Sequence, residues 1–385
     1  MSNLLSNKEL LARLVGFDST SHNSNRPIAD FICDYLDLPG VTIDRQYSTD
    51  GRKVNVIVTV GPTASPDGRG LVLSGHMDTV PAEEPEWKSD PYSLVESDGS
   101  YYGRGVCDMK GFVALAMNAA ASKHTMALDY PLVLVFTYDE EVGILGAKQL
   151  AAAYEGRNKL PRAAIIGEPT SLEVVRMHKG FLAFEVTIAG KSAHSGYPHL
   201  GKNAIEPVGP LVEALSDLRR ELETEQPPNC EFFPEVPFVA LNVGTVTGGT
   251  AANIIPDRCE VGCTVRTLPG MQTDSMIDQV RGVVQRALEG VDFEFAVTNQ
   301  TPPMLLREQT DIYQMLTAEV KQTETRSASY ATDAGWMQSI GMECAIIGPG
   351  NIGVAHRPNE SLPIAEFEQC TGLLERAIKH FCSES

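Results

Sequence analysis

The sequence predicts an α/β fold in which a mixed sheet is flanked by helices and interrupted by an inserted α+β domain. Three short apolar runs, 71–75, 132–136 and 163–166, predict buried central strands, because each is rich in Leu, Val, Ile or Ala and ends abruptly in polar residues. Patterns with apolar residues at three- and four-residue spacing predict helices before and after them, at 6–15 and 364–381. Strands that alternate with helices in this way favour an α/β sheet.

The middle of the chain has a different pattern, which indicates an inserted domain. Residues 175–291 predict a long strand, a helix, two further strands with alternating faces, and a second helix. This order suits a small α+β, ferredoxin-like domain with an open antiparallel sheet. We therefore expect one domain formed by 1–174 and 292–385, with a second domain inserted at 175–291.

Composition limits the classes of function. The 385 residues carry a formal net charge of −19, which argues against nucleic acid as a partner. The eight cysteines form no C-x-x-C pair, which is typical of reduced thiols in a cytosolic protein. Residues 1–20 lack a signal pattern, and no apolar run approaches the length of a membrane span. We expect a cytoplasmic protein that binds neither nucleic acid nor a membrane.

Acids and a histidine gather at the predicted ends of the central strands. The first strand is followed by His76 and Asp78, the second by the acids 139–141, and the third by Glu168, while Asp108 lies at the entrance of an Ala-rich helix. Each has an ordinary alternative, namely a loop histidine, a helix N-cap or a charged helix entrance in water. Because open α/β sheets bind ligands beyond the carboxyl ends of their strands, the residues together indicate a site for a divalent metal ion.

Five sequence motifs resemble those of the dinuclear-zinc M20-type metallopeptidase and deacylase family. In chain order they are Gly75-His76-x-Asp78-Thr79-Val80-Pro81, Gly105-x-x-Asp108-Met109-Lys110-Gly111, Glu140-Glu141, Gly167-Glu168-Pro169-Thr170 and the late His356. The resemblance covers nearly the whole chain, and five motifs in the same order are far more specific than any one of them. It implies a zinc-peptidase-like domain whose insertion acts as a lid and dimerisation domain. The residues at 167–170, 178–180 and 348–356 are most similar to acetylornithine deacetylases.

The resemblance implies two divalent metal ions in each chain, Zn²⁺ or alternatively Co²⁺. His76 and Glu168 would hold one ion and Glu141 and His356 the other, with Asp108 bridging both. Imidazole and carboxylate ligands suit zinc, and an anionic bridge offsets the repulsion between two dications.

The family also implies roles for the neighbouring residues. Glu140 would be the general base and later the proton donor to the leaving nitrogen. Asp78 would orient His76, and Asp139 is expected to be a solvent-exposed or helix-end charge. A cis peptide bond is implied between Asp108 and Met109.

The resemblance places further functional residues in the insertion and near the end of the chain. His194 would reach the active site of the partner subunit in a homodimer formed through the inserted domains; its alternative is a loop histidine. The stretches around Asn253 and Arg266 resemble substrate-binding segments, and the planar guanidinium suits a carboxylate, although a surface salt bridge is the alternative. Thr332 and Asp333 would line the substrate pocket or belong to an ordinary turn.

The function implied is removal of the acyl group from an N-acyl amino acid. The expected substrate is N2-acetyl-L-ornithine, which would give L-ornithine and acetate for arginine biosynthesis. Succinyl-diaminopimelate desuccinylase, aminoacylase and small-peptidase activities remain alternatives, since these enzymes share the metal ligands. Outside enzymes the alternative is a non-catalytic metal- or ligand-binding relative, against which Glu140 and all five ligand candidates are present.

Overall fold

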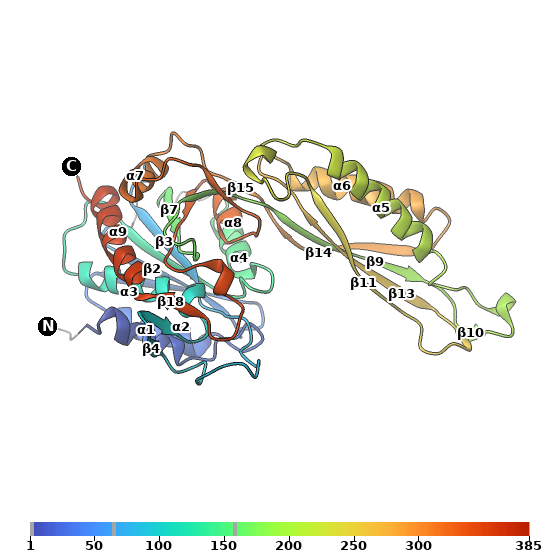
Figure 1. Cartoon of the computed structure of the whole chain (residues 1–385), viewed down its shortest axis with the longest axis horizontal. Coiled ribbons are helices and arrows are strands. Elements are labelled where there is room, and N and C mark those ends of the chain that lie inside the picture. Colours follow the sequence, from blue (N-terminus) through green and yellow to red (C-terminus); the bar gives the residue numbers. More distant parts are fainter. Residues whose placement is uncertain (1–3, 64–66, 157–159, 385) are drawn as a thin grey trace. The chain divides into compact units, whose positions relative to one another are not determined.

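The structure, a computed structural model, describes residues 4–63, 67–156 and 160–384 and divides into two compact units. The first unit comprises Met1–Arg176, Leu306–Arg326 and Thr332–Ser385, and the second comprises Met177–Leu305 and Ser327–Ala331. Figure 1 follows the chain through both units. The chain therefore leaves the first unit once for a long insertion and once more for a short segment.

The insertion ends later than the sequence predicts. We expected it to end at residue 291, but it continues to Leu305. The strand β14 (Phe293–Thr301) pairs antiparallel with β9 (Phe181–Ala189), so that it completes the sheet of the second unit. A strand pattern alone does not reveal which sheet the strand joins, and this explains the difference.

The first unit is built on a mixed sheet, as the sequence predicts. The strand order is β1-β2-β6-β3-β7-β17-β8, and β3, β6 and β7 are fully buried neighbours that run parallel. Their carboxyl ends therefore meet at one edge. The strands are β1 (Val41–Tyr47), β2 (Val54–Val60), β3 (Leu71–His76), β6 (Leu132–Thr137), β7 (Ala163–Ile166), β8 (Val175–His178) and β17 (Glu343–Ile346).

Helices cover both faces of this sheet. The helices α3 and α9 pack on each other and on β3, whereas α4 packs on β2 and α8 packs on α4 and β17 (Figure 1). The helices of the first unit are α1 (Asn7–Val15), α2 (Arg26–Leu36), α3 (Gly111–Lys123), α4 (Leu145–Tyr154), α7 (Asp311–Val320), α8 (Ala334–Ser339) and α9 (Ile364–Cys382). A separate small sheet of order β18-β5-β4 consists of β4 (Val95–Ser97), β5 (Ser100–Tyr102) and β18 (Ser361–Pro363).

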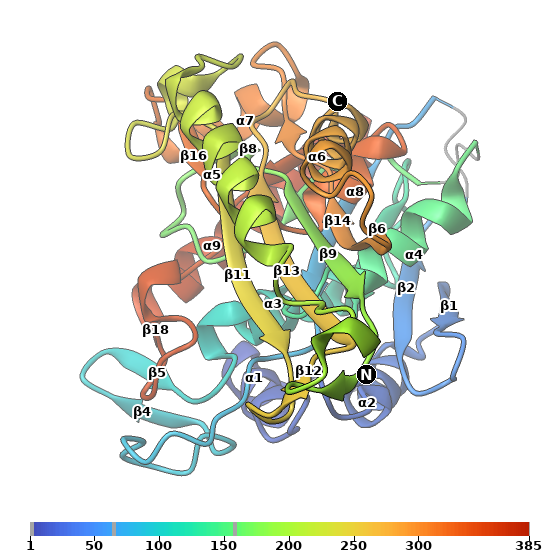
Figure 2. The ribbon, with the colours of Figure 1, turned by 90° about the vertical axis from the view of Figure 1, so that its right-hand side faces the viewer.

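The second unit is an α+β domain with an antiparallel sheet of order β11-β13-β9-β14. Side chains along β9 and β13 alternate between buried and more exposed, because one face packs on α5 (Val208–Thr224) and α6 (Thr273–Ala287), as Figure 2 shows. Its other strands are β10 (Ala193–His194), β11 (Ala240–Gly248), β12 (Ile254–Ile255) and β13 (Arg258–Arg266), whereas β15 (Met304–Leu305) and β16 (Arg326–Ala328) both pair with β8 of the larger sheet.

The cysteines and the helices add two further observations. The eight cysteines are all free thiols. Within the described ranges, no helix combines the length and the apolar character that crossing a membrane requires.

Candidate metal centre

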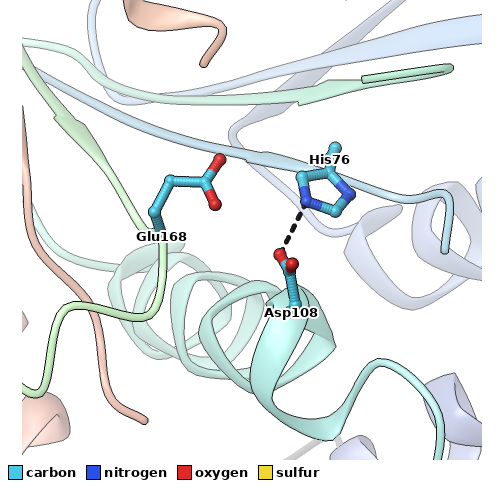
Figure 3. A group of neighbouring side chains, drawn as sticks. All are labelled: His76, Asp108 and Glu168. Carbon is cyan, nitrogen blue, oxygen red and sulfur yellow. Dashed lines mark hydrogen bonds and ion pairs between the residues drawn. The ribbon is translucent and has the colours of Figure 1, made fainter. Parts of the chain in front are cut away.

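The five predicted ligands lie together in the first unit, in two groups that share one residue. His76, Asp108 and Glu168 form the first group (Figure 3). Asp108, Glu141 and His356 form the second, and in each group one ligand atom per residue lies within 4.8 Å of the others. The first group is buried, whereas the side chain of His356 is 50% exposed.

The carboxylate of Asp108 faces both groups at once. Its Oδ1 lies 3.0 Å from His76 Nε2, and its Oδ2 lies 3.3 Å from His356 Nε2. His356 Nε2 is also 2.9 Å from Glu141 Oε2. Two oxygens of one carboxylate that serve different neighbours have the arrangement that a bridge between two ions requires.

Local structure explains how these residues meet. His76 is the last residue of β3, and Glu168 follows β7, the parallel neighbour of β3. Asp108 lies in the short helical turn Val106–Lys110 that precedes α3, and its peptide bond to Met109 is cis, as the resemblance implies. The parallel strands thus deliver two of the residues to one edge, and the turn delivers the third.

Asp78 contacts His76 through its backbone oxygen. The Nδ1–H of His76 donates to the backbone oxygen of Asp78 at 2.9 Å, which leaves Nε2 directed at Asp108. The Asp78 carboxylate lies 3.7 Å from that Nδ1 and instead accepts hydrogen bonds from the backbone N–H groups of Glu140 and Glu141. The side chain of Asp78 therefore holds the segment that carries these two acids.

Burial and neighbouring carboxylates raise the pKa values of the acids at this site. Burial raises the pKa of Glu140 well above its usual value, and the charge of Glu168 raises it further. Burial likewise raises the pKa of Glu168, with Asp108 as the second cause. Hydrogen bonds to Asp108 and Glu141 raise the pKa of His356 to about 10. Buried carboxylates that raise one another's pKa favour a bound cation.

The donor set fits divalent metal ions. It consists of three carboxylates and two imidazoles, the ligand types that zinc and similar ions prefer. Glu141 Oε1 is buried and has no hydrogen-bond partner within the part of the chain that the structure describes. A buried carboxylate oxygen without a partner is costly, so this atom suits the role of a metal ligand.

Glu140 belongs to neither group of potential ligands. Its backbone is held by Asp78, and its side chain is adjacent in sequence to Glu141. An acid beside the ligands, with its pKa raised by burial, suits proton transfer better than ligation.

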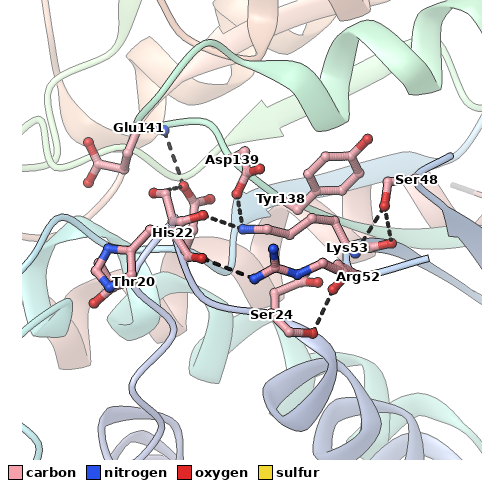
Figure 4. Close-up of polar contacts among 12 residues, drawn as sticks. Thr20, His22, Ser24, Ser48, Arg52, Lys53, Tyr138, Asp139 and Glu141 are labelled. Carbon is pink, nitrogen blue, oxygen red and sulfur yellow. Dashed lines mark hydrogen bonds and ion pairs between the residues drawn. The ribbon is translucent and has the colours of Figure 1, made fainter. Parts of the chain in front are cut away.

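The expectation for Asp139 was wrong. Its side chain is buried and forms an ion pair with the buried Lys53 (Figure 4). The same ammonium group donates to the backbone oxygen of Ser21. The partner, Lys53, directly precedes β2 and lies 86 positions from Asp139, so residues near Asp139 could not reveal that its charge is compensated inside the protein.

Thr332 and Asp333 are buried in the first unit. Asp333 Oδ2 accepts a hydrogen bond from Thr137 Oγ1 at 2.6 Å, and burial raises the pKa of this acid to about 6. Thr332 Oγ1 accepts from the backbone N–H of Ala334 at 3.1 Å. The threonine contact is that of an ordinary turn at the start of α8, whereas Asp333 faces the end of β6.

The remaining candidates lie in the second unit. His194, on β10, is exposed, and its neighbour Ser195 donates a backbone hydrogen bond to the oxygen of Asn253 at 2.9 Å. Arg266 ends β13 and is only partly exposed, with its guanidinium 4.4 Å from the ring centroid of Phe181. Among the residues that the structure describes, no acid forms an ion pair with Arg266, so the alternative of a surface salt bridge does not apply.

Sequence reasoning missed Glu360. This buried acid accepts backbone hydrogen bonds from Gly105, Cys107 and Asp108, so it supports the turn that carries the shared carboxylate. A single acid in a polar loop gives no signal of such a role. The only available sign was its position four residues after His356.

Comparisons with known proteins agree with this architecture. Residues 72–380 match the model of the peptidase family M20/M25/M40. The acetylornithine deacetylase of Myxococcus xanthus is 36% identical over 384 residues, covering 97% of this chain and 96% of the relative. A metallo-carboxypeptidase of the M20 family from Sulfolobus solfataricus superimposes with a TM-score of 0.77 at 17% identity, over 98% of this chain and 99% of that structure. A dinuclear metal-binding peptidase of the same family from Bacillus subtilis has a TM-score of 0.65 at 15% identity, over 97% of both chains.

Proposed function

The chain belongs to the peptidase family M20/M25/M40 and is a hydrolase of amide bonds, and we propose that it removes the acetyl group from N2-acetyl-L-ornithine, giving L-ornithine and acetate. The similarity to the acetylornithine deacetylase of Myxococcus xanthus, over nearly the full length of both chains, supports this substrate. The eight free thiols suit an enzyme of the cytoplasm, where arginine biosynthesis would use it.

The observation that carries the proposal is the shared position of Asp108 between two groups of donors. We propose that the chain binds two divalent ions, Zn²⁺ or Co²⁺. His76 and Glu168 would hold one ion and Glu141 and His356 the other, with Asp108 between them. When bound, the two ions would supply Lewis-acid chemistry, polarising the carbonyl of the amide and making a water molecule more acidic.

Glu140 would move the proton. Its carboxylate would accept a proton from the attacking water and donate it to the nitrogen that leaves as the amine. Its backbone is held by Asp78 Oδ1, so the acid has a defined position beside the ligands. A general base must lie within hydrogen-bond reach of the proton that it takes. The hydrogen bond from the backbone N–H of Glu140 to Asp78 restricts where this side chain can lie.

Substrate recognition would fall to the second unit. The guanidinium of Arg266 lies on the ring of Phe181, and among the described residues no acid pairs with it. It is therefore available to bind the α-carboxylate of the amino acid, with Asn253 as an additional donor. His194 would complete the site of a second subunit in a homodimer.

A substrate panel tests the proposal. Purified protein is incubated with N2-acetyl-L-ornithine, an N-succinyl diamino acid, other N-acetyl amino acids and dipeptides, and acetate, succinate and free amine are measured. We expect acetate release from acetylornithine with the highest kcat/KM. Preferred release of succinate, or preferred cleavage of dipeptides, would identify the corresponding alternative enzyme. No hydrolysis of any compound by protein with two bound ions would indicate a non-catalytic relative.

A further inference from the structure

A buried carboxylate outside both groups of ligands lies directly behind Asp108. The small sheet brings it there: Ser361 on β18 is opposite Tyr102 on β5, and Gly103 donates a backbone hydrogen bond to the oxygen of Glu360 at 3.3 Å. This register turns the side chain of Glu360 towards the segment 104–108.

The carboxylate of Glu360 accepts hydrogen bonds from most of that segment. Oε1 accepts from the backbone N–H groups of Cys107 at 2.9 Å and Asp108 at 3.0 Å. Oε2 accepts from the backbone N–H of Gly105 at 2.9 Å and from Arg104 Nη1 at 2.9 Å. Glu360 is only 1% exposed, and burial of a charged group is tolerated only with such complete pairing.

Arg104 extends the connection to the segment that follows His356. This arginine is 1% exposed and lies over the ring of Trp87, with its guanidinium carbon 5.1 Å from the ring centroid. Besides pairing with Glu360, its Nη1 approaches the backbone oxygen of Arg357 at 3.4 Å. The pair Arg104–Glu360 therefore joins the turn that carries Asp108 to the loop that carries His356.

We propose that Glu360 is a positioning residue that fixes the backbone of Asp108, and with it the distance between the two groups of metal ligands. The inference rests on the proposed two-ion function. A bridging carboxylate must present both oxygens at defined positions, and functional geometry tolerates errors of only about half an ångström. Glu360 accepts hydrogen bonds from three backbone amides between Gly105 and Asp108. These bonds restrict the movement of the turn that carries the bridging carboxylate.

The test uses Glu360→Gln in the full chain. The glutamine side chain has an NH₂ group in place of one carboxylate oxygen. This group faces N–H donors that the carboxylate now binds, so hydrogen bonds to the turn are lost and the turn becomes less restricted. Zn²⁺ or Co²⁺ is titrated into metal-free protein and followed by calorimetry. We expect affinity to fall about 10- to 100-fold, the usual effect of losing an outer-shell partner. The matched control is Glu308→Gln, which breaks the ion pair with the buried Arg176 in the same unit.

A second measurement separates positioning from general loss of stability. Amide hydrogen exchange in metal-free protein should accelerate at 104–108 in Glu360→Gln, while exchange in β3 and β6 stays as in the wild type. If Glu360→Gln does not fold, Arg104→Lys, which keeps the charge but loses the planar fork, should weaken metal binding in the same direction. Wild-type affinity in Glu360→Gln, or an equal loss in Glu308→Gln, would overturn the inference. If the wild-type chain binds no ions, the two-ion function fails, whereas unchanged exchange at 104–108 refutes the role of Glu360 itself.

Discussion

Asp78 Oδ1 accepts a hydrogen bond from the backbone N–H of Glu140 at 3.1 Å. The other oxygen, Oδ2, accepts from the N–H of Glu141 at 3.3 Å and from Ser21 Oγ at 2.7 Å. The backbone oxygen of the same residue accepts from the imidazole of His76. One buried aspartate therefore positions the proposed general base and two proposed ligands.

The first prediction follows from these contacts. Asp78→Asn replaces one acceptor by an NH₂ group that must face a donor, so we expect kcat to fall about 10- to 100-fold, as for other residues that orient metal ligands. Steady-state kinetics and metal titration measure the effect. Ser21→Ala is the control, because it removes one donor and leaves both backbone hydrogen bonds, and it should lose less activity. Unchanged kcat and metal affinity in Asp78→Asn would contradict this role.

Two adjacent acids should respond differently to the same substitution. Glu140→Gln should keep both ions and lose roughly 10²–10⁴-fold in kcat, the usual contribution of a general base. Glu141→Gln should weaken metal binding itself, since it removes a ligand beside His356. Metal content and kcat measured on both variants decide between the roles. Loss of metal from the Glu140 variant and retention by the Glu141 variant would reverse them.

The sequence predicts the parts of the site that depend on strand order. His76 ends one strand and Glu168 follows another, both strands are buried throughout, and the carboxyl ends of parallel strands meet at one edge. Contacts between distant segments are different. Glu360 reaches Asp108 across 252 positions, and Lys53 reaches Asp139 across 86. No local pattern reveals such partners. This explains why Glu360 was missed and why Asp139 was expected in solvent.

Register and atom choice also lie beyond sequence patterns. The spacing of His76 and Asp78 indicates that they are close, but it does not show whether the carboxylate or the backbone oxygen meets the imidazole. The late end of the insertion has a similar cause. The pairing of β14 with β9 is a choice between sheets, and both candidate sheets suit the same alternating pattern.

Removal of the metal ions should abolish hydrolysis without unfolding the chain. Each unit has an apolar core of its own, so the fold does not depend on metal as it does in small zinc domains. Exhaustive chelation followed by activity assays and circular dichroism tests this, and Zn²⁺ or Co²⁺ should restore activity. Full hydrolysis by protein shown to contain no metal would refute the proposed chemistry.

His178 predicts a dependence of stability on pH. Its ring is fully buried, Nδ1 donates to the backbone oxygen of Lys179 at 2.9 Å, and burial lowers its pKa to about 4, with the charge of Arg266 acting in the same direction. Between pH 4 and 6.5 the unfolded chain therefore binds a proton at this histidine that the folded chain does not. The free energy of unfolding should rise with pH across that range and become level above it, with a contribution of about 3 kcal/mol.

Denaturant unfolding at several pH values measures this contribution. In His178→Gln the amide can still donate to the Lys179 oxygen, and the free energy of unfolding should rise less steeply between pH 4 and 6.5. His199→Gln, at an exposed histidine of the same unit, should behave as the wild type. An identical slope in His178→Gln would show that the buried imidazole does not cause the acid sensitivity.

The proposed homodimer makes a prediction about His194. The strand β11 is one of the two edge strands of the four-stranded sheet; among the residues that the structure describes it pairs with β13 alone, and most of its own residues are exposed. An unpaired strand edge of this kind can pair with the same edge of a second copy. His194 would then supply the partner's site with a donor for the carbonyl oxygen as it becomes negative. We expect His194→Ala to keep both ions and near-normal KM but to lose about 10²–10³-fold in kcat.

Complementation tests whether His194 acts in trans. A heterodimer of His194→Ala and Glu140→Gln chains has one site in which both residues are intact, because the Glu140 of one chain meets the His194 of the other. Mixing the two inactive variants should therefore recover part of the wild-type activity. His199→Ala serves as the control, since it alters another exposed histidine of the same unit and should leave kcat unchanged. If subunits are shown to exchange and no activity returns, His194 does not serve the partner's site.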